Sequence, residues 1–339
     1  MHKISVLIAT YNCLKFIEKT IESVLNQTYP NIEIIVIDDF STDGTAQYLS
    51  SLDDSRLTVL VNERNIGYLD TFNRLIKLST GDYITFVDGD DYIANEKLEN
   101  QLDFMIRNKL DFCGTQFIKI DERGRELVYS TLPIEKDEIK NAILTGAMPF
   151  VGSSIMITRE IVENIGGYRY FFSGIPGEDI DWIARIIDKY EGKNMQEHYY
   201  YYRFHSNSLT RRVHNTVKAR HVRDIIAFLS NQRDNNNGKD SLDDDFISEP
   251  LEKFLEKLKE QYEKDKFLMA RKCSFDHAVN GNYKESFLLI KSILKSDSII
   301  NSFKNMKLIL CFFILVIFPR SVLLKIMGVL NVKNITSGF

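Results

Sequence analysis

The chain lacks several signals that would assign it to a common functional class. Its four cysteines show neither metal-site spacing nor a disulfide framework, which is typical of reduced thiols in the cytosol. Its net charge of −4 argues against a nucleic-acid partner, because no long basic stripe suited to a phosphate backbone is present. No internal repeat of the solenoid kind is visible. These absences favour a globular cytoplasmic protein with no nucleic-acid partner.

Two nucleotide-binding motifs and a signal peptide are also absent. The strand–helix junctions contain neither Gly-x-Gly-x-x-Gly nor Gly-x-x-x-x-Gly-Lys-Ser/Thr, which excludes a dinucleotide fingerprint and a P-loop. Met1-His2-Lys3 leads directly into a strand pattern, so we expect no signal peptide and a cytoplasmic location. A nucleotide would therefore have to be held by acidic residues and a metal ion.

Acidic residues are absent after Asp297, where five basic residues remain. Among these lies an apolar run over 308–318, which is shorter than the roughly 20 residues that span a bilayer. Basic residues around a short apolar helix are typical of an element lying at an anionic membrane surface, and a helix packed on the protein is the alternative. We predict a basic, apolar, membrane-associating segment over 301–339, at the inner face of the cell membrane.

Strand and helix patterns alternate along the first half of the chain. Apolar runs typical of buried strands occur at residues 4–10, 32–37, 57–61, 83–87, 111–120, 151–157 and 199–204. Helical spacing of apolar residues occurs at 14–25, 69–76 and 96–108. Strands separated by helices imply right-handed crossovers. The pattern therefore predicts an α/β fold with a mostly parallel sheet flanked by helices.

The domain organisation follows from where this alternation stops. We predict one α/β domain over 1–215 and a helical extension over 216–300. A polar, Asn-rich stretch indicates a linker near 231–249. The helices that follow are expected to turn at Gly281-Asn282, ahead of the C-terminal segment.

Polar residues follow three of the predicted strands at their carboxyl ends: Thr10-Tyr11-Asn12, Asp38-Asp39 and Asp88-Gly89-Asp90-Asp91. Such ends share one edge of a parallel sheet, so these residues should converge on one cleft. Crowded carboxylates repel one another, and Mg²⁺ or Mn²⁺, which also bind phosphate oxygens, would relieve that repulsion. An acidic turn or a helix N-cap is the alternative for the last group taken alone.

Two later clusters carry further polar groups. Glu178 and Asp179 begin an apolar helix, where capping and the helix dipole also favour acidic residues. Arg203 and His205 follow a tyrosine-rich strand together with several hydroxyl groups. A cation and an imidazole suit diphosphate oxygens and a metal, although a single histidine at a strand end is more often structural.

The order of these motifs resembles that of the family-2 glycosyltransferases with the GT-A fold. The matching segments are Ile-Ala-Thr-Tyr-Asn at 8–12, Ile-Asp-Asp-Phe-Ser-Thr-Asp-Gly-Thr at 37–45, Asp-Gly-Asp-Asp at 88–91, Gly-Glu-Asp at 177–179 and Tyr-Arg-x-His-x-Asn-Ser-x-Thr at 202–210. The resemblance extends from residue 3 to about residue 212. It implies a bacterial enzyme of surface-polysaccharide synthesis that moves one sugar from a nucleotide sugar, most often a UDP-sugar, to a saccharide or lipid-linked acceptor.

The resemblance also implies roles for individual residues. The nucleotide would be bound by Thr10, Tyr11, Asn12, Asp38, Asp39, Asp88 and Arg203, with Asp39 at the base. The metal, Mn²⁺ or Mg²⁺, would be held by Asp88, Asp90, Asp91 and His205, with Asp90 as the direct ligand. Asp179 matches the general base, with Glu178 as the alternate. A single base with no second catalytic carboxylate predicts inversion at the anomeric carbon.

The chain departs from the family pattern at one place. Where members often carry Ala-Arg-Asn, this chain has Thr71-Phe72-Asn73. The resemblance therefore implies the fold more directly than it implies the nucleobase and the donor sugar. The processive synthases carry Gln-x-x-Arg-Trp and several membrane spans, both missing here, so a single addition is favoured. A sugar nucleotidyltransferase would need a Gly-rich loop after the first strand. A binding protein of the same fold without catalysis stays open, as does assembly into a homo-oligomer.

Overall fold

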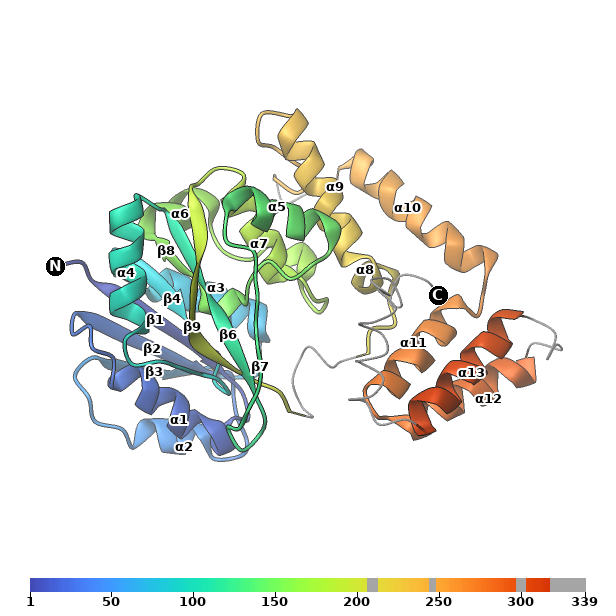
Figure 1. Cartoon of the computed structure of the whole chain (residues 1–339), viewed down its shortest axis with the longest axis horizontal. Coiled ribbons are helices and arrows are strands. Elements are labelled where there is room, and N and C mark those ends of the chain that lie inside the picture. Colours follow the sequence, from blue (N-terminus) through green and yellow to red (C-terminus); the bar gives the residue numbers. More distant parts are fainter. Residues whose placement is uncertain (206–212, 244–247, 297–302, 318–339) are drawn as a thin grey trace. The chain divides into compact units, whose positions relative to one another are not determined.

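The computed structural model describes residues 1–205, 213–243, 248–296 and 303–317 (Figure 1). The chain divides into two compact units. We call the first the sheet unit; it comprises Met1–Ser206 and Arg223–Asp243. The second, the helical unit, comprises Asn207–Val222 and Asp244–Phe339.

Within its described residues, the sheet unit contains a nine-stranded sheet in the order β3-β2-β1-β4-β8-β6-β9-β5, with β7 paired to β6. The strands are β1 (Ile4–Thr10), β2 (Ile32–Asp38), β3 (Leu57–Val61), β4 (Tyr83–Phe86), β5 (Tyr92–Ile93), β6 (Phe112–Ile120), β7 (Glu126–Tyr129), β8 (Met156–Thr158) and β9 (Gly192–Arg203). The parallel pairings are β1–β2, β1–β4, β2–β3 and β6–β9, and they are the longer ones. The predicted mostly parallel α/β architecture is confirmed, with short antiparallel pairings around β8 and at β5 and β7.

Helices flank this sheet (Figure 1). They are α1 (Leu14–Leu25), α2 (Thr45–Ser50), α3 (Tyr68–Leu78), α4 (Lys97–Asn108), α5 (Lys136–Thr145), α6 (Arg159–Ile165), α7 (Glu178–Ile187) and α9 (Val222–Asn235), with 3₁₀ turns η1 (Gly152–Ser154) and η2 (Tyr170–Phe172). The apolar face of α1 presents Ile17, Ile21 and Val24 to the core that also contains β1 and β2. Strand β1 is buried on both faces, as a central parallel strand must be.

The register of the parallel strands determines where the polar strand ends meet. Thr10 lies opposite Asp38, and Leu7 lies opposite Phe86. The N–H of Asp39 donates to the carbonyl of Thr10 at 2.8 Å, which continues the pairing past the strand ends. The three polar strand ends therefore lie at the same edge of the sheet, as predicted.

Residues 223–243 belong to the sheet unit, whereas the sequence placed them in the helical extension and its linker. Part of the polar stretch is α9. Asp240, in the loop after it, is buried and forms ion pairs with Arg169 and Arg233. A buried carboxylate needs cationic partners, and Arg169 lies 71 residues away in the sequence. A local pattern of asparagines gives no indication of such a partner.

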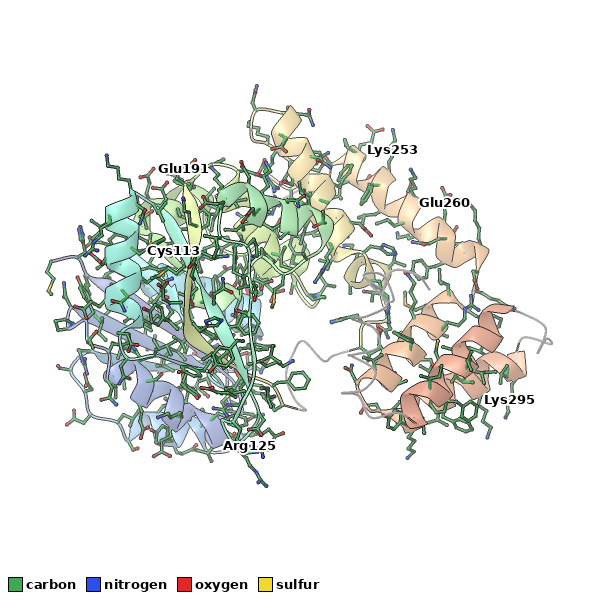
Figure 2. All side chains as sticks on the ribbon, viewed as in Figure 1. Cys113, Arg125, Glu191, Lys253, Glu260 and Lys295 are labelled. Carbon is green, nitrogen blue, oxygen red and sulfur yellow. The ribbon has the colours of Figure 1, made fainter. Side chains whose placement is uncertain are left out.

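The helical unit contains α8 (Val217–Arg220), α10 (Glu249–Lys264), α11 (Leu268–Val279), α12 (Tyr283–Ser296) and α13 (Phe303–Ile317). Gly281, at φ +81°, lies in the turn between α11 and α12, as predicted. Phe275, Ile290, Ile293 and Leu308 form a small core between three of these helices. Figure 2 shows the charged side chains that project from this unit, such as Lys253 and Glu260 on α10.

The predicted membrane-associating segment, 301–339, is described only over 303–317, where α13 packs on α11 and α12. The rest of that segment lies outside the described residues. Among the ranges that the structure describes, no helix combines the length and hydropathy that crossing a membrane requires.

Candidate functional site

The ends of β1 and β2 are joined through Asn12 and Ser41. The N–H of Asn12 donates to Oγ of Ser41 at 2.7 Å, and the N–H of Thr42 donates to Oδ1 of Asn12 at 2.8 Å. Asp38 is fully buried and accepts from both the N–H and the hydroxyl of Ser41, at 2.8 and 2.5 Å. Asn12 adopts φ +52°, a conformation that asparagine tolerates better than most residues. Asn12 and Asp38 therefore shape the loop after β2.

Asp39, predicted to bind the nucleobase, organises the loop between β3 and α3. Its Oδ1 accepts from Nδ2 of Asn62 at 2.7 Å and from the N–H of Ile66 at 2.8 Å, while its Oδ2 accepts from the N–H of Gly67 at 2.8 Å. A carboxylate has about four acceptor positions. Donors from the described residues occupy three of these positions, which leaves one position on Oδ2.

Thr10 and Gly89 bring β1 into contact with the acidic residues after β4. A Cβ atom added to Gly89 would lie 2.8 Å from Oγ1 of Thr10, so a larger residue would force the two segments apart. Thr10 is buried, whereas Tyr11 beside it is 47% exposed. Of these two predicted nucleotide-binding residues, Tyr11 is the one whose side chain is accessible.

Asp88 to Asp91, which we call the strand-end group, begins with a carboxylate held by two hydroxyls. Tyr68 donates to Oδ1 of Asp88 at 3.2 Å, and Ser153 donates to Oδ2 at 2.5 Å. Burial raises the pKa of Asp88, and the negative charges of Asp90 and Asp179 raise it further, to about 6. Asp88 therefore ionises close to neutral pH, and its position depends on α3 and η1 as well as on β4.

Asp91 has a structural position rather than a ligand-binding one. It is buried, and it accepts from the hydroxyl of Tyr200 at 2.8 Å and from the N–H of Arg203 at 2.6 Å. Burial and the charges of Asp90 and Asp88 raise its pKa well above the ordinary value. Asp91 connects the end of β4 to β9.

Arg203, predicted to contact the diphosphate, points its guanidinium at the backbone. Its Nε donates to the carbonyl of Asp90 at 2.7 Å, and its Nη1 donates to the carbonyls of Asp121 and Glu122 at 3.1 and 3.2 Å. The group also lies 4.7 Å from the ring centroid of Phe16. In this conformation Arg203 supports the main chain of the strand-end group.

Asp90 and His205 form the pair best suited to a divalent cation. Nε2 of His205 lies 2.8 Å from Oδ2 of Asp90, and their side chains are 11% and 26% exposed. Within the described residues, no group of three or more His, Cys, Asp or Glu side chains is arranged to hold a metal. A Mg²⁺ or Mn²⁺ ion that takes one or two protein ligands, with phosphate oxygens and water for the rest, nevertheless fits a carboxylate and an imidazole.

Glu178 to Asp181, which we call the helix-start group, occupies the first turn of α7. Gly177 precedes it at φ +95°, a conformation that glycine adopts without strain. Burial and Asp179 raise the pKa of Glu178 to about 8. Burial also raises the pKa of Asp179, and the N–H of Ile180, which donates to its Oδ1 at 2.8 Å, acts in the opposite direction.

The structure brings the strand-end and helix-start groups to one place. The pKa of Tyr68 is raised well above the ordinary value by burial and then by Asp88, Tyr168, Glu178 and Asp179. The pKa of Tyr168 is raised by burial and by the same three carboxylates. Two acidic clusters 90 residues apart in the chain therefore share one buried polar centre, lined by two tyrosines that the sequence motifs did not indicate.

Phe72 explains the departure from the family motif. It is buried and stacks on Tyr168 with ring centroids 3.7 Å apart and on Phe86 at 4.6 Å, and it meets Trp182 edge-on at 5.5 Å. An arginine at this position would place a charge inside an aromatic cluster. The replacement thus forms part of the packing between α3, β4 and α7.

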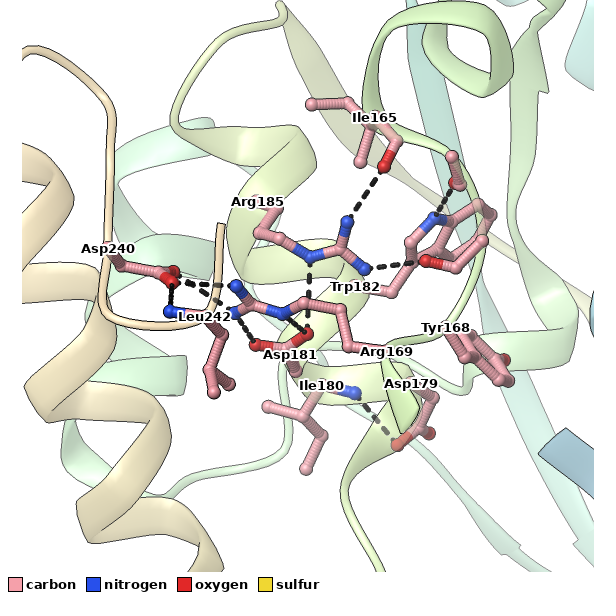
Figure 3. Close-up of polar contacts among 12 residues, drawn as sticks. Ile165, Tyr168, Arg169, Asp179, Ile180, Asp181, Trp182, Arg185, Asp240 and Leu242 are labelled. Carbon is pink, nitrogen blue, oxygen red and sulfur yellow. Dashed lines mark hydrogen bonds and ion pairs between the residues drawn. The ribbon is translucent and has the colours of Figure 1, made fainter. Parts of the chain in front are cut away.

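Helix α7 is held by a buried ionic network that the sequence motifs did not reveal (Figure 3). Asp181 accepts from Nε of Arg169 at 3.0 Å and from Nε of Arg185 at 3.2 Å. Arg169 also contacts Asp240 at 2.7 Å, and Nε1 of Trp182 donates to the carbonyl of Gly166 at 2.7 Å. In the sequence, only the four-residue spacing of Asp181 and Arg185 indicates that these two side chains can pair on a helix. These bonds hold the helix whose first turn carries Asp179.

Comparisons with known proteins agree with this geometry. A model of the family described as "Glycosyl transferase family 2" matches residues 5–166. The chain is 33% identical over 211 residues to the Escherichia coli protein WfaP, a UDP-Glc:alpha-D-GlcNAc-diphosphoundecaprenol beta-1,3-glucosyltransferase, covering 62% of this chain and 80% of that protein. It is 38% identical over 109 residues to WfgD of Escherichia coli, a glucosyltransferase named for the same reaction, covering 32% of this chain and 43% of that protein.

A solved structure resembles the chain over most of its length. S. aureus TarS in complex with UDP-GlcNAc superposes with a TM-score of 0.55 at 18% identity, covering 81% of this chain and 86% of that chain. At this identity the similarity concerns the fold, and it confirms the predicted fold class.

Proposed function

The chain belongs to glycosyl transferase family 2, and from that premise we propose that it transfers one sugar from a UDP-sugar to a hydroxyl of a lipid-linked saccharide. The chain is a glycosyltransferase. Our proposal concerns which donor and acceptor it uses and which stereochemistry the transfer follows. The relatives WfaP and WfgD use UDP-Glc and a saccharide linked through diphosphate to undecaprenol. TarS was solved with UDP-GlcNAc. These relatives support a UDP-sugar donor and an acceptor of surface-polysaccharide assembly.

The observation that carries the mechanism is the meeting of Asp179 with the strand-end group in one buried centre. Deprotonated Asp179 accepts the proton of the acceptor hydroxyl. The hydroxyl oxygen bonds to the anomeric carbon while the bond from that carbon to the diphosphate oxygen breaks. Burial and the neighbouring Asp179 raise the pKa of Glu178 to about 8, and Glu178 is the alternate base. A single displacement of this kind inverts the anomeric configuration.

The leaving diphosphate would lie against the strand-end group. Asp90 and His205 would hold Mn²⁺ or Mg²⁺, which when bound supplies positive charge beside the diphosphate oxygens. Asp39 keeps an acceptor position for a base N–H, and the exposed ring of Tyr11 is accessible to the nucleotide. Arg203 would contact phosphate oxygens only after leaving the carbonyls of Asp121 and Glu122.

A donor screen tests the proposal. The purified full chain is incubated with a GlcNAc-diphospho-lipid and with individual sugars of UDP and of other nucleotides, with and without Mn²⁺, and the released nucleotide is measured. We expect release from one donor, increased by Mn²⁺, and an inverted product by NMR. Release only from a donor with another nucleotide would overturn the UDP assignment. Unchanged release in EDTA would overturn the proposed metal dependence, and a retained configuration would overturn the displacement mechanism.

We also propose that the helical unit contacts the cytoplasmic face of the membrane. Apolar side chains are exposed along α13, and Phe287 and Leu288 are exposed on α12. The exposed residues on α13 are Leu310, Phe313, Ile314 and Val316. Exposed lysines on the same α12 would attract anionic lipids: Lys284, Lys291 and Lys295.

Flotation with vesicles containing anionic lipid tests this contact. The variant Leu310→Ser/Phe313→Ser should float less than the wild type, because both side chains would enter the lipid boundary. Leu127→Ser/Val128→Ser, at exposed apolar positions on β7, is the matched control and should float normally. Equal flotation of all three proteins would remove this surface from the proposal.

A further inference from the structure

An open hollow of about 620 Å³ lies against one face of α3, outside the carboxylate centre. Asp70, Asn73, Arg74 and Lys77 line it at helical spacings of three and four residues, so they share one face of the helix. Arg64, from the loop before α3, and Tyr170, from η2, complete the wall.

The hollow carries an excess of positive charge. Within the described part of the chain, none of its cations (Arg64, Arg74 and Lys77) forms an ion pair with a carboxylate. The carboxylate among the described lining residues, Asp70, is already bonded to the hydroxyl of Tyr170 at 2.6 Å. Three cations that converge on a hollow without acidic partners favour an anionic ligand.

Two side chains connect this hollow to the predicted nucleotide-binding loop and to the wall of the buried centre. Nη1 of Arg74 donates to Oδ1 of Asn62, whose Nδ2 donates to Asp39 at 2.7 Å. Asn73 exchanges two hydrogen bonds with the backbone of Tyr168, at 2.9 and 2.8 Å. Hydrogen bonds therefore link the lining of the hollow to Asp39, through Asn62, and directly to Tyr168 in the wall of the buried centre.

We propose that this hollow binds the diphosphate group of the acceptor, an inference that rests on the proposed function. Guanidinium groups bind phosphate oxygens through two parallel N–H donors, and an ammonium adds charge. A volume of this size is within the range that holds a small ligand. The donor diphosphate is assigned to the strand-end group at the sheet edge, and the hollow on α3, which adjoins the Asp39 loop at Ile66, is separate from that group.

Binding of inorganic diphosphate tests the site directly. Calorimetry is run on the full chain free of divalent cations, with and without excess UDP, so that any diphosphate binding that competes with UDP is distinguished from binding in the hollow. Arg64→Gln/Lys77→Gln should weaken diphosphate binding at least tenfold. Arg107→Gln, which removes an exposed cation from α4, is the matched control and should bind as the wild type does. Equal binding by the double variant and the wild type overturns the proposal.

Two acceptor analogues then identify the source of the anion. One is GlcNAc-diphosphate with a short alkyl chain, and the other is the alkyl GlcNAc glycoside without phosphate. In the double variant the KM of the diphosphate analogue should rise at least tenfold, while that of the glycoside should not change. A rise in the donor KM instead would assign the hollow to the donor and overturn the proposal. If the wild type uses neither analogue yet the double variant loses diphosphate binding, the anion site stands and the proposed acceptor is wrong.

Discussion

The strand-end group and the helix-start group are both acidic runs, yet they are stabilised by different means. In each, one carboxylate is turned into the protein and others face the shared centre. Asp91 is bonded by neutral donors, a tyrosine hydroxyl and a backbone N–H. Asp181 is bonded by the guanidinium groups of Arg169 and Arg185.

This difference shows that an acidic motif does not specify the role of its members. Among the described residues, no cationic side chain is bonded to the carboxylate of Asp91, and burial together with the charges of Asp90 and Asp88 raises its pKa. Asp181 belongs to a network in which removal of one charge leaves others buried without a partner. Both arrangements hold a neighbouring carboxylate, Asp88 or Asp179, at the same centre.

The largest expected effect is on catalysis. Asp179→Asn should lower kcat by a factor on the order of 10³, because the acceptor hydroxyl loses its general base. Asp103→Asn, on the exposed face of α4, is the control and should leave kcat unchanged. The measurement is UDP release by both variants at equal concentrations of folded protein. Activity within threefold of the wild type would show that another residue is the base.

Next in size is the cost of breaking the buried network. Asp181→Ala should lower the free energy of unfolding by about 3–5 kcal/mol, because Arg185 would lose its buried counter-charge and Arg169 would keep only Asp240 as a close one. Urea unfolding measures this loss, and Asp103→Ala should stay within about 0.5 kcal/mol of the wild type. A loss below about 1 kcal/mol would mean that the network does not anchor α7.

The corresponding substitution in the strand-end group should lower the free energy of unfolding by a smaller amount. Asp91→Asn is expected to lower the free energy of unfolding by about 1–2 kcal/mol, because the single amide oxygen can accept from only one of the two donors that now bond the two carboxylate oxygens. The same urea experiment compares the two groups. A loss as large as that of Asp181→Ala would erase the proposed difference between them.

The smallest effect concerns pH. The pKa of Glu178 is raised from 4.5 to about 8 in the folded protein, so the native state binds more protons than the unfolded state between these values. Its contribution to stability is complete below pH 4.5 and is lost as pH rises through 8. Glu178→Gln should therefore flatten the decline by about 1 kcal/mol between pH 7 and 8. Parallel pH profiles for the variant and the wild type would contradict the raised pKa.

Much of the fold could be predicted because it depends on local periodicity. The runs at 4–10, 32–37 and 83–87 identified the central strands, and their parallel pairing placed Thr10, Asp38 and Asp88 at one edge. The partners of these residues could not be predicted in the same way. Ser153 reaches Asp88 from 65 residues away, and no spacing in the sequence indicates that contact.

The sequence by itself determined the α/β architecture, the family and the set of acidic residues at the sheet edge, because strand periodicity and motif order are local properties. Only the tertiary structure decided which acids face the centre and which are turned inward. It directed Arg203 to backbone carbonyls, enclosed Phe72 among aromatic rings and paired Asp240 with Arg169. The physical reason is that the charge and hydrogen bonding of a buried group depend on partners brought together by packing.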